Sequence, residues 1–440
     1  MLLVLADPLS GHARSDVMLY AITMIYLGLI YVRPTELIGG WAGVPMVATA
    51  AAVAAPLLGW ALLEGRGRLM QLPQDRLLWA LWAAIVVSNL FTGYVGGAIL
   101  GLTDFAQVVF QYTLIRSAIR TLGQLRGAMI GLTAFMLLHA ISGIVQIRTG
   151  VGFGGVEPLI TELEEVRIRS VGIFGDPNDL ALSMVVVIAF LIVTLVNQAA
   201  SWLARGLALV VLAPMLYAYY FTNSRGGILG LAAALAVIGW RRYGSKLGPL
   251  FVVAGLAGII ALGPSRLAEM DTEEDSAQGR IQAWAAGLDM LQSNPLTGVG
   301  YGRFTDFHPL VAHNSFVQVL SELGLAGSIA FNGMVYWYFI AIRRLEVLPK
   351  VNVPPFRAWQ TGFLAMGSAF FVSILFLSRQ YNPVFYTVVA LAACYVSVVL
   401  DNEKVAIRAS YKNHVTVTVL TAGLVIVLVV VVRLFAAWGG

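Results

Sequence analysis

The stretch PNDLALSMVVVIAFLIVTLVN, residues 177–197, decides the fold class of this chain. From Leu180 to Val196 it has no charged residue, and as a helix rising about 1.5 Å per residue it can cross the apolar core of a bilayer. Of the 440 residues in the chain, 59% are hydrophobic and 12% are charged, and the mean hydropathy is +0.81. Soluble proteins carry roughly 25% charged residues. The composition therefore predicts an all-α, polytopic transmembrane helical bundle and argues against a soluble protein.

Comparable apolar segments lie on both sides of this stretch, and we expect about 12–13 spans of about 17–25 residues each. The segments lie near 17–36, 43–63, 77–97, 102–118, 127–147, 177–197, 206–222, 226–240, 248–263, 314–342, 357–377, 383–400 and 414–436. Several are rich in glycine and alanine, which lets helix backbones approach closely in lipid. No internal repeat is evident, which weakens the interpretation as a secondary transporter.

The basic residues predict the orientation, because cytoplasmic loops of membrane proteins carry an excess of Lys and Arg. With the N-terminus inside, 18 of the 28 basic residues fall on the cytoplasmic side, including every lysine. Two long loops, 148–176 and 264–313, then lie outside the cytoplasm. The net charge of +5 reflects this topology, and no nucleic-acid partner is expected. The outer basic residues are all arginine, whose guanidinium binds oxyanions through paired donors.

The stretch 263–327 is the long polar part of an otherwise apolar chain. It holds five acids within 269–275, followed by Arg280 and His313. Functional side chains are concentrated on such loops. An enzyme on the outer face has no ATP or nucleotide sugars available, so its substrate must arrive activated. A lipid-linked diphosphate meets that condition.

Arg225 lies in the sequence NSRGG, residues 223–227, between two spans with almost no loop. Asn or Ser is a favourable N-cap, which would place Arg225 in the first turn of the next helix. The free N–H groups of a helix N-terminus and a guanidinium together predict a phosphate site. Alternatively, Arg225 reaches the lipid headgroups, and the two glycines serve helix packing.

Arg280 stands at the start of a predicted short amphipathic helix, 278–294. Its apolar positions Ile281, Trp284, Leu288 and Leu291 form one helical stripe. We expect this helix to lie on the membrane surface and to end at Asn294-Pro295. Arg280 could then contact a headgroup or a diphosphate. The alternative is that it pairs with the acidic run 269–275.

His313 opens the following span, with Gln318 and Glu322 one turn apart on one face. A helix N-terminus and nearby arginines disfavour the charged imidazole, so His313 is suited to act as a base near neutral pH. Alternatively it only caps its helix, and His308 is a competing base. Zinc is not expected, because there are five histidines without paired spacing. The one cysteine, Cys394, lies in an apolar run and is interpreted as a packing residue.

Two further segments carry weaker signals. The smaller outer loop holds Arg169, a candidate diphosphate contact, and then Asp176 and Asp179, which are typical of a helix cap before an apolar run. The segment LTGVGYGRF, residues 296–304, has alternating glycines that suggest a nucleotide loop. Because no strand precedes it, we interpret it as a loop shaped by glycine.

Together these segments resemble the O-antigen ligase and polysaccharide polymerase family of bacterial inner membranes. The matching pieces are RSVGIFGDPNDLA (169–181), NSRGG (223–227), GR-x₃-W (279–284), NPLTGVGYGRF (294–304) and AHNSF-x₄-SELG (312–324). The resemblance covers roughly residues 165–345. It divides the chain into N-terminal helices (1–164), a catalytic core with a periplasmic loop (165–345) and C-terminal helices (346–440).

The resemblance implies a fold of about twelve spans of the C-type glycosyltransferase kind. It also implies a location in the bacterial inner membrane, with the active site on the periplasmic side. The donor would be an undecaprenyl-diphosphate-linked glycan, and the acceptor would be linked to a glycan, a lipid or a protein. By the same resemblance, His313 is the catalytic base, and Arg225 and Arg280 bind the diphosphate, with Arg169 as a further contact. Neither a cofactor nor a metal ion is expected.

The implied reaction is a metal-independent, inverting transfer. His313 deprotonates an acceptor hydroxyl, which attacks the anomeric carbon, while Arg225 and Arg280 stabilise the departing diphosphate. A polymerase that joins lipid-linked repeat units is the main alternative. A lipid-linked glycan flippase would need charged residues along a path through the bilayer, and few lie mid-span. A structural scaffold would give no reason for clustered outer arginines.

Overall fold

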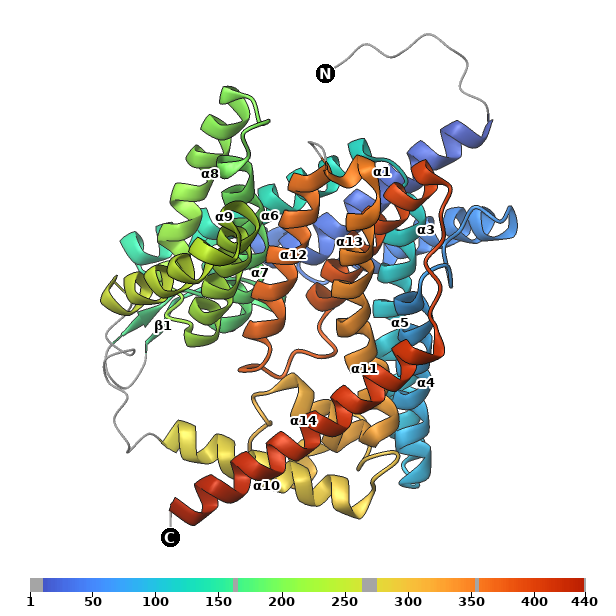
Figure 1. The fold of residues 1–440 in the computed structure, drawn as a ribbon, viewed down its shortest axis with the longest axis vertical. Coiled ribbons are helices and arrows are strands. Elements are labelled where there is room, and N and C mark those ends of the chain that lie inside the picture. The colour runs from blue at the N-terminus through green and yellow to red at the C-terminus, as the bar shows by residue number, and fades with distance from the viewer. Residues whose placement is uncertain (1–10, 161–164, 263–274, 353–355, 439–440) are drawn as a thin grey trace.

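The computed structural model describes residues 11–160, 165–262, 275–352 and 356–438, and this part of the chain is almost entirely helical (Figure 1). The α-helices are α1 Gly11–Val32, α2 Pro34–Leu37, α3 Met46–Leu63, α4 Pro73–Phe91, α5 Val95–Ala118, α6 Leu122–Thr149, α7 Pro177–Val196, α8 Trp202–Tyr220, α9 Arg225–Leu262, α10 Asp275–Ser293, α11 Ser315–Arg344, α12 Phe356–Ser373, α13 Pro383–Glu403 and α14 Tyr411–Trp438. One small hairpin pairs β1, Leu159–Ile160, antiparallel with β2, Val166–Arg167.

The prediction of a polytopic helical membrane protein is confirmed. Within the described residues, nine helices are long and apolar enough to cross a membrane, and every expected span falls on a helix. The sequence predicts two separate spans at 226–240 and 248–263, and the structure has two helical stretches there that meet at a kink between them. Both stretches carry the label α9, and the kink is at Gly244 (φ 72°, ψ −173°).

The bundle packs around α13, which is buried along nearly its whole length and contacts α5, α6, α11 and α12. Small residues allow the close helix packing, because Gly230 of α9 leaves no room for a side chain beside Ser373 and Ala369 of α12. Cys394 is fully buried in α13, in agreement with its interpretation as a packing residue.

A buried ion pair lies between α4 and α5, and its arginine is one of the basic residues that the predicted topology assigns to the cytoplasmic side. The Arg116 side chain is completely buried, and its Nε donates to Asp75 Oδ1 at 3.0 Å while its Nη2 donates to Oδ2 at 3.1 Å. Tyr112 donates its hydroxyl to the same carboxylate at 2.7 Å, and Arg116 Nη1 donates to Ser397 of α13 at 3.0 Å. Arg116 is therefore a core residue, and its hydrogen bonds to Asp75 and Ser397 offset the cost of burying its charge.

Other basic residues expected on the cytoplasmic side gather at one end of the bundle. Arg66 and Arg120 pair with Asp16, and Arg68 pairs with Asp401 at the end of α13. These contacts lie at the C-terminal ends of α5 and α13. The N-terminal ends of α11 and α13 lie at the opposite end of the bundle, where α10 also lies (Figure 1).

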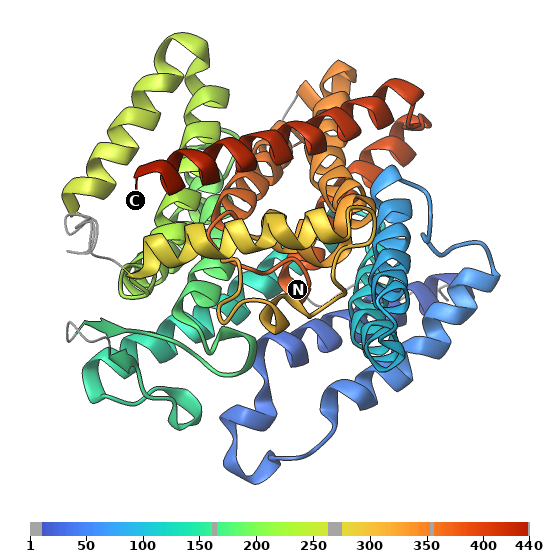
Figure 2. The ribbon, with the colours of Figure 1, turned by 90° about the horizontal axis from the view of Figure 1, so that it is seen from below.

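Helix α10 packs on protein, and this changes the expectation of a helix lying on the membrane surface. Its apolar stripe is buried at Leu288 and Leu291 against α11 and α14, and α10 runs beside α14 in both views (Figures 1 and 2). Gly287 carries no side chain where α10 approaches Ser321 of α11. Most of the acidic run 269–275 lies outside the described residues.

Candidate functional site

His313 lies immediately before α11, in the left-handed backbone conformation (φ 48°). The cap itself is Asn314, whose side-chain oxygen accepts from the N–H groups of Phe316 at 2.9 Å and Val317 at 3.2 Å. The helix thus has its own capping residue, which leaves the half-buried imidazole of His313 available for another role. A histidine at positive φ is uncommon and is held there by the surrounding structure.

The connection between α12 and α13, residues 374–382, holds the start of α11 in place. The backbone N–H of Ser315 donates to the carbonyl of Ile374 at 3.0 Å, and its hydroxyl donates to the carbonyl of Leu377 at 2.6 Å. The hydroxyl also accepts from the N–H of Arg379 at 2.8 Å. The position of His313 is therefore fixed by a segment more than sixty residues later in the chain.

Arg379 is a site residue that sequence reasoning missed, because it was noted only as one of the outer arginines. Its guanidinium makes a two-pronged ion pair with Asp179 in the first turn of α7, with Nη2 donating to Oδ2 at 2.8 Å. Asp176 is the N-cap of α7, as expected, and its side chain accepts from Asn178 N–H at 2.7 Å. The role of Asp179 thus goes beyond the predicted helix cap, because its ion pair with Arg379 joins α7 to the segment 374–382.

Arg225 begins α9, as the sequence predicted. Ser224 is fully inside the protein and its hydroxyl accepts from Gly227 N–H at 3.2 Å, in the manner of an N-cap. A Cβ on Gly226 would lie 3.1 Å from Phe376, and Ser373 donates to the Gly226 carbonyl at 3.0 Å. Gly226 therefore serves packing against α12 and the 374–382 connection, whereas Gly227 packs against Tyr219 and Ala181.

Four helix N-termini, those of α7, α9, α11 and α13, meet around the 374–382 connection. Asp179 of α7 and Ser315 of α11 form hydrogen bonds with Arg379 of this connection. Gly226 of α9 packs against the connection, and Asn382 within it caps α13. Each helix presents the positive end of its dipole to this region. The arrangement favours an anionic ligand and disfavours a protonated imidazole.

The surroundings of His313 act on its ionisation in the same direction. Its pKa lies below the usual value for histidine, first because the imidazole is partly buried and second because the charges of Arg280 and Arg379 oppose protonation. Asp176 acts in the opposite sense but more weakly. The structure therefore brings Arg280 and Arg379 near His313, and the imidazole is neutral near neutral pH.

Helix α10 positions Arg280 next to this histidine. Trp284, one turn later in α10, donates its indole N–H to the carbonyl of Ala312 at 2.8 Å, directly before His313. Arg280 itself is partly exposed. The tryptophan of the GR-x₃-W pattern is thus the residue that ties α10 to the segment carrying the histidine.

A buried polar network lies on the inner side of the site. Gln318 donates to Glu322 at 2.7 Å, and its side-chain oxygen accepts from Ala312 N–H at 3.0 Å and from Ser378 at 2.9 Å. Tyr381 donates its hydroxyl to the other carboxylate oxygen of Glu322 at 2.9 Å. The network joins α11, the 374–382 connection and the backbone next to His313, so it supports the geometry of the histidine.

The glycine-rich segment 296–304 packs against a break in α11. The helix leaves its regular geometry at Gly324 (φ 61°), and the N–H groups of Val299 and Gly300 donate to the carbonyls of Ser321 and Glu322, each at 3.0 Å. A Cβ on Gly298 would lie 2.4 Å from the backbone of Glu322. The interpretation of a loop shaped by glycine is confirmed, because the two backbones touch.

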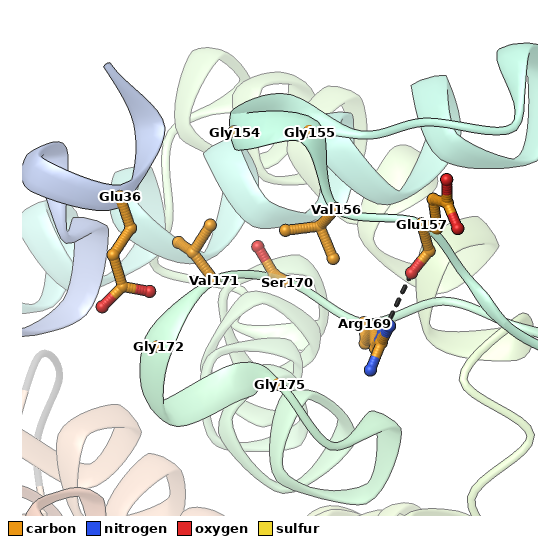
Figure 3. Close-up of a pocket in the computed structure, with 10 residues that line it drawn as sticks. All are labelled: Glu36, Gly154, Gly155, Val156, Glu157, Arg169, Ser170, Val171, Gly172 and Gly175. Atoms are coloured by element: carbon orange, nitrogen blue, oxygen red, sulfur yellow. Dashed lines mark hydrogen bonds between the residues drawn. The ribbon is translucent and has the colours of Figure 1, made fainter. Parts of the chain in front are cut away.

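Arg169 lies along a separate cavity of about 410 Å³, drawn in Figure 3. Its Nε donates to the carbonyl of Glu157 at 2.9 Å, and Glu36 and Gly172 line other parts of the cavity. The predicted role of Arg169 as a diphosphate contact is therefore not supported by a described contact with His313 or Arg280. Arg167, two residues earlier, reaches closer to the site.

Arg167 is buried and ties the segment before α9 to the start of α7. Its Nε donates to the carbonyl of Thr222 at 3.0 Å and its Nη2 donates to Asn178 at 3.1 Å. These partners precede Arg225 and Asp179 respectively. The sequence signal for Arg167 was weak, because an arginine beside a run of glutamates is usually a surface residue.

His308 and a metal site are the two alternatives to a base at His313. His308 lies in the loop with its Nδ1 2.9 Å from the carbonyl of Leu310. In the part of the chain that the structure describes, no three His, Cys, Asp or Glu side chains gather as metal ligands would.

The fold defines a multi-pass helical membrane protein whose helix N-termini, arginines and one histidine meet at one end. Residues 210–332 match the model of the family described as O-antigen ligase, so this segment of the chain is similar to that family. The match supports a membrane enzyme of the O-antigen ligase and polymerase type. The matched segment contains Arg225, Arg280 and His313, whereas Arg379 lies beyond it. No curated protein matches the chain.

Proposed function

We propose that this protein transfers a glycan from an undecaprenyl-diphosphate-linked donor to a hydroxyl group of an acceptor on the periplasmic face of the bacterial inner membrane. The observation that carries the proposal is the placement of His313 beside Arg280 and Arg379 at a meeting of helix N-termini. A neutral base close to a strongly positive anion site is what inverting transfer from a diphosphate requires.

In the proposed reaction, His313 accepts the proton of the acceptor hydroxyl as its oxygen attacks the anomeric carbon. The bond from that carbon to the diphosphate oxygen breaks, and undecaprenyl diphosphate leaves with the electron pair. Arg225 and Arg280 bind the diphosphate, whose negative charge grows in the transition state. Their guanidinium groups supply the charge that a metal ion supplies in other transferases, so the reaction is proposed to be metal-independent.

Arg379 joins this set as an additional positive charge that opposes protonation of His313. Because its guanidinium is already held by Asp179, we assign it the role of positioning the base and adding to the positive field. We propose Arg169 as a second contact to the glycan or diphosphate of a long donor.

The experiment uses the purified full-length protein with a lipid-linked glycan donor and a chelator present. We expect transfer in the wild type, at least about a hundredfold loss in His313→Ala, and unchanged donor binding in that variant. His308→Ala is the matched control and should retain transfer. Full activity of His313→Ala, or activity lost to the chelator and restored by a metal, would contradict the proposal.

The acceptor decides between ligase and polymerase, and the same preparation separates them. Donor supplied alone should remain unextended if the enzyme is a ligase. Chain growth from donor alone would assign the protein as a polymerase that joins repeat units. The roles of His313 and the arginines are the same in both cases.

A further inference from the structure

A second polar cavity of about 460 Å³ lies at the start of α5, apart from His313. It is lined on one side by Tyr94 and Asp104 from the α5 region, and on the other by Tyr301, Arg303 and Asp306 from the glycine-rich loop. Neither the sequence motifs nor the proposed chemistry accounts for this cavity. It is joined to the site through one aromatic contact, because the rings of Tyr301 and Tyr381 meet edge to face at 4.7 Å.

Asp104 is the unexpected residue of this cavity. It lies in a helix long and apolar enough to span the membrane, about 13 Å along the axis from Val95. Its side chain is exposed at the cavity, and within the described residues it makes no hydrogen bond or ion pair. A carboxylate at such a depth is costly unless a cavity or a ligand solvates it, and it therefore marks a functional position.

The other side chains around the cavity match a sugar ring. Tyr94 is 45% exposed, and the guanidinium of Arg303 lies over its ring at 5.4 Å. Arg303 is also held by Asp306, with Nε donating to Oδ2 at 2.8 Å. Apolar ring faces of a sugar pack on aromatic side chains, while its hydroxyls donate to carboxylates and accept from guanidinium groups.

The charge of the cavity distinguishes it from the site at His313. Two carboxylates, Asp104 and Asp306, face one guanidinium, so the lining is net negative. The pKa of Tyr301 is raised to about 12, first by burial of its hydroxyl and then by the negative charges of Asp104 and Glu322. A diphosphate or an acidic sugar would be repelled here, whereas a neutral or amine-bearing sugar would not.

Resting on the proposed function, we propose that the cavity between Tyr94, Asp104 and Arg303 is the subsite that binds the acceptor glycan, and that it takes neutral or amine-bearing sugars. The enzyme thus keeps the two substrates on surfaces of opposite charge: the diphosphate donor at the helix N-termini, and the acceptor glycan at the start of α5.

The test measures binding of free oligosaccharides to the full-length protein in lipid nanodiscs by saturation-transfer NMR and titration. The probes are a neutral glucose oligomer, a glucosamine oligomer and a galacturonate oligomer of equal length. We expect the first two to bind and the galacturonate to bind at least about tenfold more weakly. Asp104→Asn should weaken binding of the favoured probes about tenfold or more, because a charge-assisted hydrogen bond is lost.

Asp289→Asn is the matched control, since Asp289 is an exposed carboxylate of α10 outside both sites, and it should leave binding unchanged. Tyr94→Ala provides a second variant that removes the stacking face. Equal binding in wild type and Asp104→Asn, or preference for galacturonate, would overturn the subsite.

Transfer assays separate this inference from the proposed function. If the subsite is right, Asp104→Asn raises the KM for the acceptor and leaves that for the donor unchanged. If transfer is never observed but oligosaccharide binding depends on Asp104, the subsite stands and the proposed reaction fails. If transfer depends on His313 while Asp104→Asn changes neither binding nor KM, the reaction stands and the subsite fails.

Discussion

At the scale of single residues, the ionisation of His313 depends on charges that arrive from distant parts of the chain. The sequence predicted the histidine, Arg280 and the direction of the effect, because motif and helix position were visible. It did not predict Arg379, since nothing in SRQYNP, residues 378–383, indicates contact with Asp179 two hundred residues earlier. Arg169 is the opposite case, a motif residue that the structure places along a separate cavity. Arg167, two residues earlier, instead donates to the carbonyl of Thr222, close in the chain to Arg225.

The pH dependence of transfer tests this coupling. Burial and the two arginines lower the pKa of His313, so the neutral base persists below the usual histidine pKa and kcat/KM should fall only as pH drops through a value under about 6.5. Arg280→Gln removes one opposing charge, which raises the pKa and moves this acid limb to higher pH. The measurement is the pH profile of kcat/KM for both proteins.

Arg280→Lys is the control for charge. It should keep the acid limb near its wild-type position, but lower kcat/KM because a lysine cannot form a two-pronged contact with phosphate. An acid limb that stays fixed in Arg280→Gln would show that the limb belongs to another group.

At the scale of elements, the broken helix α11 and the glycine-rich segment form one unit. Span prediction gave a continuous helix at 314–342, because the sequence SELGLAG has no proline to mark a break. The break at Gly324 exposes backbone carbonyls, and the segment 296–304 supplies the N–H groups that satisfy them. The alternating glycines thus indicated close backbone contact, but the sequence could not name the partner.

Replacing Gly298 with alanine should disrupt this unit. The added Cβ would lie 2.4 Å from the backbone of Glu322, and the position requires φ 68°, so the segment must shift and the start of α11 with it. We expect a lower midpoint of thermal unfolding in detergent and loss of transfer.

Gly43→Ala separates crowding from backbone strain. Gly43 has φ 82° but open space around it, so its cost should be limited to about 1–2 kcal/mol of left-handed strain and activity should be retained. Equal losses in the two variants would mean that the close contact at Gly298 does not matter.

At the scale of the whole molecule, composition and the spacing of apolar segments were enough to predict the helical bundle. They were not enough to place charges inside it. Arg116 was expected near the cytoplasmic surface, because loops between spans usually carry such residues, yet it lies fully buried with Asp75. The pattern of apolar residues indicates how much of each helix faces lipid or the protein core. Ion pairs between helices depend on how the helices pack, which this pattern does not show.

The Asp75–Arg116 pair provides the prediction at this scale. Asp75→Ala leaves a buried guanidinium without its carboxylate and should destabilise the protein by about 3–5 kcal/mol, seen as a large drop in the unfolding midpoint. The double variant Asp75→Leu with Arg116→Met should recover much of that loss. Asp16→Ala, which removes a more exposed pair with Arg66, should cost no more than about 1 kcal/mol; a similar cost for Asp75→Ala would refute the role of the buried pair.

The 374–382 connection also has a consequence for biosynthesis. Membrane spans enter the bilayer in chain order, so α9, α10 and the first turns of α11 are present before the connection has been made. Until that segment arrives, Ser315 lacks its partners and Asp179 lacks Arg379. A nascent or truncated chain would therefore carry the histidine and the family's arginines without the scaffold that orients them. A late segment of the chain, which precedes only α13 and α14, is what completes the site.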